Sequence, residues 1–214
     1  MSKSDVRNEI KAKLLEYGFK RKSHYVNEKH RLSFIKKENN NILSISFGEG
    51  WNSEGHTQIY PNIGIGYIDI NKLYAKLSNI KRFDYPILLE GIGNLKPVKE
   101  LMKWDFNDYG NNDNVLSEMV STIFQYAEPY WKGMSVFDNL YNAVVNKKAL
   151  LINVEEERIL PILHYLKGEK EKGKEIIEET LNSNKLQRTP SISLRGKTAQ
   201  DCYLDFAEKY EQLP

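Results

Sequence analysis

Apolar residues recur at every third or fourth position near the start of the chain, which is the period of an amphipathic helix. The stripe consists of Val6, Ile10, Leu14 and Tyr17. Ser4 can cap the start of this helix, and Gly18 stands where a glycine commonly follows a helix end. We expect Phe19 to pack back onto the last turn. The pattern therefore predicts a helix that ends before Gly18.

Strand-like segments replace the helical spacing over the next part of the chain. The links between them are too short for parallel crossovers. The segments are 24–26, 32–35, 42–47 and 59–70. In the last of them Gly64 and Gly66 lie on the face opposite Ile63 and Ile65, where they allow a helix or an aromatic ring to approach closely. This region predicts a meandering antiparallel sheet.

Helical periodicity dominates the second half of the chain. A short helix over 71–79 and an irregular stretch over 81–112, with a small strand at 87–89, come first. Later helices are predicted to begin at Asn112 or Asp113, at Ser135, at Glu155, at Glu169 and, capped by Thr198, close to the C-terminus.

The helices starting at Glu155 and Glu169 form a predicted hairpin that closes at Gly168. Pro161 should kink the first of them or end an earlier turn. The order of elements predicts an α+β fold: an N-terminal helix and antiparallel β-sheet, followed by a C-terminal helical region. We expect residues 1–112 to form the sheet region and residues 113–214 the helical region, packed together as one compact unit.

Composition narrows the class of protein. The 214 residues carry a formal net charge of only +2, which gives no strong whole-chain attraction to nucleic acid or membranes. The single cysteine, Cys202, excludes an internal disulfide. No apolar run has the length of a signal peptide core or a membrane span. These features predict a cytoplasmic protein with no membrane partner.

The segment 48–56 combines carboxylates, an aromatic ring, an amide and an imidazole with three glycines. The candidate binding residues in it are Glu49, Trp51, Asn52 and His56. Three interpretations stay open, in this order: an ordinary hairpin loop whose Trp51 packs on a neighbour, a binding loop anchored by Trp51, and a catalytic loop. Paired carboxylates alone do not make a hydrolase.

Basic residues gather early in the chain, at Lys20, Arg21 and Lys22, and continue with Lys29, Arg31, Lys36 and Lys37. Lysines commonly protect the edge of a sheet, and this is the first interpretation. The second is a surface for an acidic partner, either nucleic acid or a phosphate ligand, whose binding would weaken steeply with salt.

Motifs for catalysis, metals and cofactors are missing from the sequence. The histidines, His24, His30, His56 and His164, lack zinc-ligand spacing and are expected at the surface or half-buried. Gly64-Ile65-Gly66 lacks the third glycine of a dinucleotide fingerprint. Cys202 lies on the apolar stripe of the last helix and should be buried and inert. Tyr126, Tyr130 and Trp131 are expected to pack in the core rather than to form a platform for single-stranded nucleic acid. We predict no catalytic residue, no metal and no cofactor.

Residues 14–22, with the "GF-basic-basic" sequence at Gly18-Phe19-Lys20-Arg21 and Tyr25 in the following strand, resemble the opening of the DUF4304 group of uncharacterised bacterial proteins. Residues 163–172 resemble the C-terminal helical hairpin of such proteins, and also a single tetratricopeptide unit, of which a solenoid needs about three. The resemblance implies a bacterial protein without an assigned activity, related to small immunity proteins that bind toxins. We therefore expect a non-catalytic protein-binding module of immunity or adaptor type; the alternative is nucleic-acid or phosphate-ligand binding through the basic N-terminal region.

Overall fold

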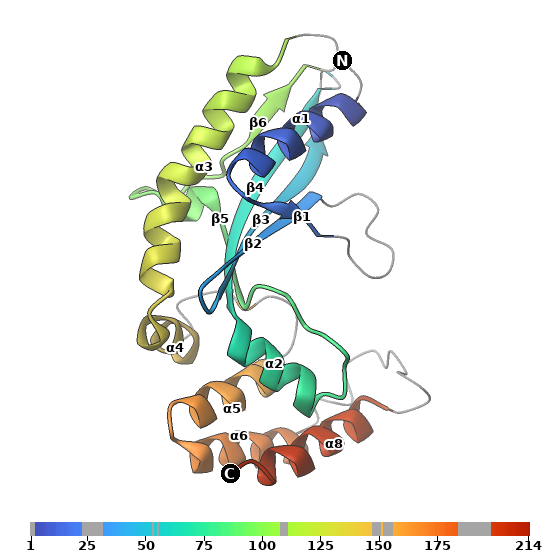
Figure 1. Ribbon diagram of the computed structural model, residues 1–214, viewed down its shortest axis with the longest axis vertical. Coiled ribbons are helices and arrows are strands. Elements are labelled where there is room, and N and C mark those ends of the chain that lie inside the picture. Colours follow the sequence, from blue (N-terminus) through green and yellow to red (C-terminus); the bar gives the residue numbers. More distant parts are fainter. Residues whose placement is uncertain are drawn as a thin grey trace. The chain divides into compact units, whose positions relative to one another are not determined.

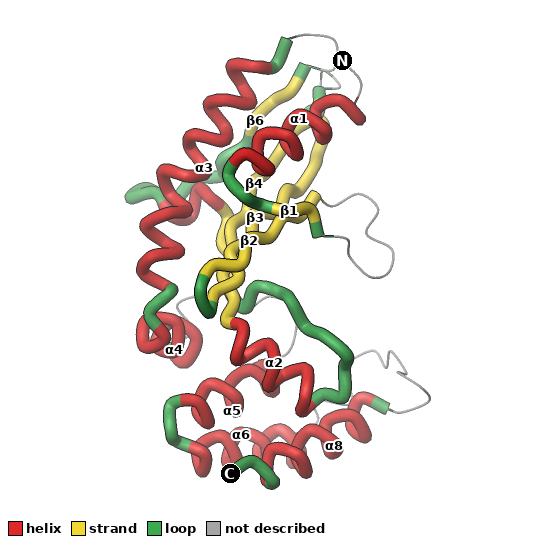
Figure 2. Tube along the Cα trace, viewed as in Figure 1, coloured by secondary structure: helices red, strands yellow, loops and turns green. Residues whose placement is uncertain are grey.

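The computed structural model describes residues 3–22, 32–52, 54, 56–107, 111–146, 151, 156–183 and 198–214. The described chain has the predicted α+β order of an N-terminal helix, an antiparallel sheet and a helical region (Figures 1 and 2). Its elements are α1 (Lys3–Glu16), β1 (Lys20–Arg21), β2 (Leu32–Glu38), β3 (Asn41–Trp51), β4 (Thr57–Tyr67), α2 (Ile68–Leu77), β5 (Leu88–Gly91), η1 (Ile92–Leu95), β6 (Trp104–Phe106), α3 (Asp113–Met134), α4 (Phe137–Val145), α5 (Glu156–Leu166), α6 (Lys170–Asn182) and α8 (Ala199–Glu211).

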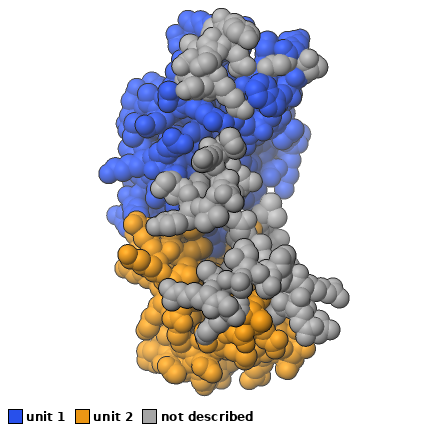
Figure 3. Space-filling view, turned by 90° about the vertical axis from the view of Figure 1, so that its right-hand side faces the viewer, with its two compact units in different colours: residues 1–65, 86–140 blue, residues 66–85, 141–214 orange. Residues whose placement is uncertain are grey.

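The chain divides into two compact units, which are coloured separately in Figure 3. Unit 1 consists of residues 1–65 and 86–140, and unit 2 consists of residues 66–85 and 141–214. Neither unit coincides with the ranges 1–112 and 113–214. The reason is that α2 contacts α5 and α8 in unit 2, whereas α3 contacts α1, η1 and β6 in unit 1.

Helix α1 ends as its sequence predicts. Gly18 has a φ of +81°, in the left-handed region that glycine adopts without strain. Its N–H donates to the Leu15 carbonyl at 3.0 Å, and the Phe19 N–H donates to the Leu14 carbonyl at 3.1 Å. This pair of bonds is a Schellman motif, in which the residue after the glycine packs back on the helix. Phe19 and Leu14 are both buried, whereas Tyr17, expected on the buried stripe, is 43% exposed.

The sheet of unit 1 has the strand order β1-β2-β3-β4-β5, and β6 pairs with β4 beside β5. Strands β2 and β3 form a hairpin in which Glu38 pairs with Asn41, so the connecting turn has two residues, and Asn39 takes a φ of +53°. The strands predicted at 32–35, 42–47, 59–70 and 87–89 are confirmed in β2, β3, β4 and β5, although β4 gives way to α2 after Tyr67. The strand predicted at 24–26 lies outside the described residues. Strand β6 was not predicted, because three residues are too few to show alternation.

Helix α3 covers the sheet with one apolar face. The buried residues of this face are Leu116, Met119, Val120, Ile123, Ala127 and Trp131. The Trp131 indole donates a hydrogen bond of 2.9 Å to the Gly64 carbonyl of β4. A Cβ at Gly64 would lie 2.6 Å from both the Leu88 carbonyl oxygen and Ser44 Oγ. A side chain at position 64 would therefore clash with the neighbouring strands, which is why glycine is required there. The Trp131 ring contacts Gly64 through the Gly64 carbonyl.

The cap predicted at Asn112 or Asp113 for α3 and the cap predicted at Ser135 for the next helix differ from the structure. Asn112 precedes the helix without a side-chain capping bond. Its Oδ1 accepts from the Asn107 N–H at 2.9 Å and its Nδ2 donates to the Asn107 carbonyl at 3.0 Å, so it fixes the preceding loop. The cap predicted at Ser135 lies one residue too early, because the Val136 carbonyl accepts the first helical bond of α4, from the Leu140 N–H at 3.2 Å. The Ser135 hydroxyl donates to the Trp131 carbonyl at 2.6 Å.

Unit 2 packs α2, α5, α6 and α8 together. Pro161 lies inside α5 and has no N–H, so the Glu157 carbonyl one turn earlier loses its usual donor. The Tyr203 hydroxyl of α8 donates to that carbonyl at 3.0 Å. The Tyr210 hydroxyl donates to the Pro161 carbonyl at 2.9 Å and passes over Gly173 of α6, where a Cβ would lie 1.9 Å from it.

The start of α8 confirms the predicted cap. The Thr198 hydroxyl accepts from the Asp201 N–H at 3.1 Å, and the Asp201 carboxylate accepts from the Thr198 N–H at 2.9 Å, which is a capping box. Cys202 is half-buried rather than buried as expected, because it lies at the border of the apolar face formed by Tyr203 and Phe206. None of the described helices is long and apolar enough to cross a membrane.

Candidate functional site

The predicted loop at 48–56 is largely an extension of β3. Glu49 lies within this strand, and Arg7 of α1 binds both of its carboxylate oxygens. The distances are 2.8 Å from Nε to Oε1 and 2.5 Å from Nη2 to Oε2. Such a bidentate pair is the strongest common form of charge-assisted hydrogen bond. The Glu49 side chain is only 11% exposed, so its carboxylate holds α1 against the sheet.

The other three candidate residues of the loop, Asn52, His56 and Trp51, differ in their exposure to solvent. The Asn52 Oδ1 accepts hydrogen bonds of 2.9 Å from the N–H groups of Glu54 and His56, so Asn52 shapes the turn between β3 and β4. His56 is half-buried, and its Nδ1 lies 3.8 Å from the Glu54 carboxylate. Trp51 is 58% exposed. Trp51 is therefore the most exposed of the four candidate binding residues in this loop.

The basic residues Lys20 and Arg21 do not share one face. Lys20 and Arg21 are exposed on β1, but successive residues of a strand point to opposite faces. The Lys22 N–H donates to the Ser33 carbonyl at 2.8 Å. Lys36 lies 3.6 Å from the Glu38 carboxylate. Lys29 and Arg31 lie outside the described residues.

Unit 1 has a groove that sequence reasoning missed. It measures about 440 Å³ and lies between the β2–β3 hairpin and the C-terminal half of α3, two elements that run near each other in Figure 1. We call it the aromatic groove and define it by the wall residues Tyr17, Phe19, Phe124 and Trp131 and the rim residues Lys36, Glu38, Glu128 and Lys132. A volume of this size is in the range of ligand-binding pockets.

The wall of the aromatic groove is a connected set of rings. Tyr17 stacks on Phe124 with their centroids 4.1 Å apart and their planes 20° apart. The ring centroid of Trp131 lies 5.6 Å from that of Phe19 and 6.3 Å from that of Phe124. Trp131 is buried, as core packing predicts, whereas Tyr17 is 43% exposed and faces the groove. The wall is therefore rigid at its base and accessible at its edge.

The rim combines both signs of charge. Lys36 and Glu38 pair with each other. Glu128 and Lys132 lie one turn apart on α3, both exposed, and neither side chain forms a hydrogen bond or ion pair with any residue that the structure describes. Asn41 also lines the groove, and its Oδ1 is buried with no partner in the described part of the chain. A buried acceptor without a donor is costly, so an occupant that supplies an N–H there would be favoured.

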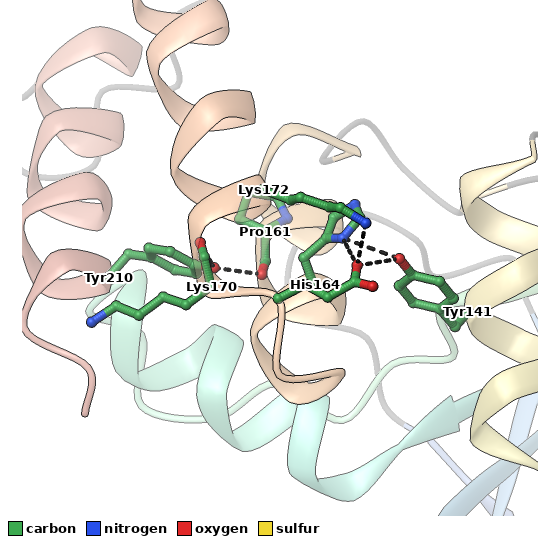
Figure 4. A network of polar contacts seen from close by, with 7 residues as sticks. Tyr141, Pro161, His164, Lys170, Lys172 and Tyr210 are labelled. Carbon is green, nitrogen blue, oxygen red and sulfur yellow. Dashed lines mark hydrogen bonds and ion pairs between the residues drawn. The ribbon is translucent and has the colours of Figure 1, made fainter.

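A second polar arrangement lies in unit 2, where Tyr141, His164 and Lys172 point toward one another (Figure 4). The Glu169 Oε2 is their shared partner. It accepts from the Tyr141 hydroxyl at 2.8 Å and lies 2.9 Å from His164 Nδ1 and 3.2 Å from Lys172 Nζ. The hydrogen bond with His164, followed by those with Tyr141 and Lys172, lowers the pKa of Glu169 to about 2. Burial, with a contribution from Glu169, raises the pKa of Tyr141 to about 12.

The backbone explains why these side chains meet. Gly168 has a φ of +84°, its N–H donates to the Tyr165 carbonyl at 3.0 Å, and the Glu169 N–H donates to the His164 carbonyl at 2.8 Å. This is again a Schellman motif, and it confirms the hairpin closure predicted at Gly168. The main chain and the side chain of Glu169 thus both bond to His164. We therefore assign this polar network to the closure of the α5–α6 hairpin.

The burial of His164 corrects a prediction. His164 is 7% exposed, whereas a surface or half-buried position was expected. The spacing His164, Gly168, Glu169 was the available signal, since a carboxylate directly after a helix-ending glycine returns to the last turn. His24 and His30 lie outside the described residues. Among the residues that the structure does describe, no three His, Cys, Asp or Glu side chains gather as metal ligands would.

A scan against protein-family models, a search of curated proteins and a search of solved structures each found no match. The resemblance of residues 14–22 and 163–172 to the DUF4304 group stays a prediction.

Proposed function

We propose that this chain is a non-catalytic protein-binding module of immunity or adaptor type, which occludes a partner by holding a segment of it in the aromatic groove. The observation that carries the proposal is the groove itself. Its wall presents the exposed ring of Tyr17 stacked on Phe124, and its rim carries the unpaired charges of Glu128 and Lys132 among the described residues.

A polypeptide segment suits these features better than a small rigid ligand. Its side chains can pack on Tyr17 and Phe124, and aromatic residues are enriched at the centres of protein interfaces. Its main-chain N–H groups can satisfy the buried Asn41 Oδ1. Its charged side chains can pair with Glu128 and Lys132, which fixes the direction of the segment more than it adds affinity.

The distribution of exposed apolar side chains also supports binding through unit 1. Trp51, Val98, Leu101 and Val136 are each more than half exposed, and all four belong to unit 1. The immunity or adaptor character itself comes from the resemblance to the DUF4304 group.

The proposal is tested by capturing the tagged chain from its native cells at low and then moderate salt. We expect one stoichiometric protein that survives moderate salt, and a loss of about tenfold or more in its recovery for Tyr17→Ser. Leu204→Ser is the matched control, because Leu204 is 42% exposed in unit 2 and Tyr17 is 43% exposed. Circular dichroism verifies that both variants are folded.

Two other outcomes would redirect the assignment. If Trp51→Ala abolishes capture while Tyr17→Ser does not, the partner binds the loop after β3 and the groove is not the site. If the captured material is nucleic acid that dissociates as salt rises, the basic N-terminal residues are responsible, since counterion release makes such binding salt-dependent.

A further inference from the structure

Two apolar side chains of unit 1 are almost fully exposed. Val98 is 77% exposed and Leu101 is 79% exposed. Both belong to the connection from η1 to β6, residues 96–103, which we call the docking loop (Figure 2). Trp51, at 58%, is less exposed than either of them.

The docking loop is held in a defined shape. The Gly93 carbonyl accepts hydrogen bonds from the Lys96 N–H at 3.4 Å and from the Glu100 N–H at 3.3 Å. The side chains of Lys96 and Glu100 form an ion pair. The backbone at Glu100 passes so close to Gly93 that a Cβ at Gly93 would lie 1.8 Å from the Glu100 carbonyl oxygen. A loop fixed in this way loses little conformational freedom on binding, which favours affinity.

The net charge around the two apolar side chains is positive, because the loop carries three lysines and one glutamate. Lys99 and Lys103 are exposed on either side of Leu101 in the sequence, and neither forms a hydrogen bond or ion pair with a residue in the described ranges. Glu100 is already paired with Lys96. The surface that complements the loop is therefore apolar at its centre and carries carboxylates at its border.

We propose that the docking loop inserts Val98 and Leu101 into an apolar pocket of a partner protein that is bordered by Asp or Glu side chains. The inference rests on the proposed function, because it assigns a second contact surface to the same binding module. A second copy of the chain fits less well, because two identical loops would bring their lysines together. A lipid surface fits less well, because stable anchoring takes more apolar area than one valine and one leucine supply.

The test places a photo-crosslinking benzoylphenylalanine at position 98 or 101 of the full chain in its native cells. Positions 166 and 204 are the matched controls, since Leu166 and Leu204 are exposed apolar residues of unit 2, at 38% and 42%. We expect one protein adduct at 98 and 101 that is at least about tenfold stronger than at the controls. Mass spectrometry should map it to an apolar segment of the partner bordered by Asp or Glu.

Two variants sharpen the result. Leu101→Asp should reduce the adduct formed from position 98 about tenfold by placing a charge in an apolar pocket, and Lys99→Glu should reduce it at low salt more than at high salt. Adducts of equal strength at loop and control positions would overturn the inference. So would Leu101-dependent sedimentation of the protein with vesicles of phosphatidylserine and phosphatidylcholine, which would assign the loop to a membrane surface.

The outcomes separate this inference from the proposed function. If positions 98 and 101 give no adduct above the controls while capture still depends on Tyr17, the docking loop is excluded and the groove remains the binding site. If neither the loop nor Tyr17 affects the recovery of any protein, both proposals are wrong.

Discussion

Helices α1 and α5 end with the same backbone motif but with opposite chemistry. Gly18 and Gly168 have nearly equal φ values, +81° and +84°, and each is followed by the same pair of hydrogen bonds to the last turn. The next residue is Phe19 in unit 1 and Glu169 in unit 2. Phe19 is buried and forms part of the aromatic groove, whereas Glu169 gathers Tyr141, His164 and Lys172. The motif sets only the backbone, and one side chain decides between apolar packing and a polar network.

The largest effect is expected for Phe19→Ala. Removing a fully buried aromatic ring should destabilise unit 1 by about 3–5 kcal/mol and collapse the wall that Phe19 shares with Trp131. All three tryptophans, Trp51, Trp104 and Trp131, belong to unit 1, so urea unfolding followed by tryptophan fluorescence reports on this unit. A loss below about 1 kcal/mol would show that the ring contributes little beyond its local contact.

Gly18→Ala and Gly168→Ala should have nearly equal effects. A Cβ at Gly168 meets nothing within 4 Å, and one at Gly18 meets only the Lys36 side chain at 3.7 Å. The cost is then the left-handed backbone conformation alone, about 1–2 kcal/mol at each position. Tryptophan fluorescence measures the first variant, and amide hydrogen exchange in α5 and α6 measures the second. A much larger loss at one position would mean that the two helix ends are not equivalent.

Tyr141→Phe removes one of the donors to Glu169 and leaves the ring in place. His164 and Lys172 still bind the carboxylate, so we expect a loss of about 0.5–1.5 kcal/mol, confined to unit 2. Hydrogen exchange of the α5 and α6 amides should report it. Unchanged tryptophan fluorescence unfolding serves as the internal control, and a shift there would contradict the assignment of this network to unit 2.

The smallest expected effect is on the stability of the α5–α6 hairpin at acidic pH. Glu169 has its pKa lowered from 4.5 to about 2 in the folded chain, so its ionised form is favoured by folding. This contribution is complete above pH 4.5 and disappears as the pH falls from 4.5 through about 2. Glu169→Gln should make the amide exchange of α5 and α6 less sensitive to pH in that window. Equal acid sensitivity in both proteins would show that Glu169 is not responsible.

Local features of the fold were predictable from the sequence, because their signals lie within a few residues. The glycines at positions 18 and 168 and the cap at Thr198 are examples, since each depends on a backbone geometry that neighbouring residues specify. The antiparallel sheet followed from alternation and short links. Strand β6 could not be predicted in this way, because it has three residues and is recognised only by its pairing with Thr57–Ile59, which is distant in sequence.

The candidate sites depend on contacts between residues that are distant in sequence, and such contacts could not be predicted. Nothing near Glu49 indicates that Arg7, 42 positions earlier, neutralises its carboxylate. The aromatic groove joins Tyr17 to Phe124, which is 107 positions later in the sequence. The exposure of Trp51 was also unpredictable, because an aromatic residue in a loop can equally well pack on a neighbour.

Pro161 has a consequence for the order in which the chain can fold during synthesis. The carbonyl groups at Glu157 and Pro161 receive hydroxyl donors from Tyr203 and Tyr210 of the last helix. Until α8 has been made, the Glu157 carbonyl lacks the Tyr203 donor and Gly173 lacks its contact with Tyr210. Unit 1, by contrast, contains all its residues once position 140 has been added. The ribosome therefore delivers a complete unit 1 before α5 and α8, the helices that α2 contacts, have been made.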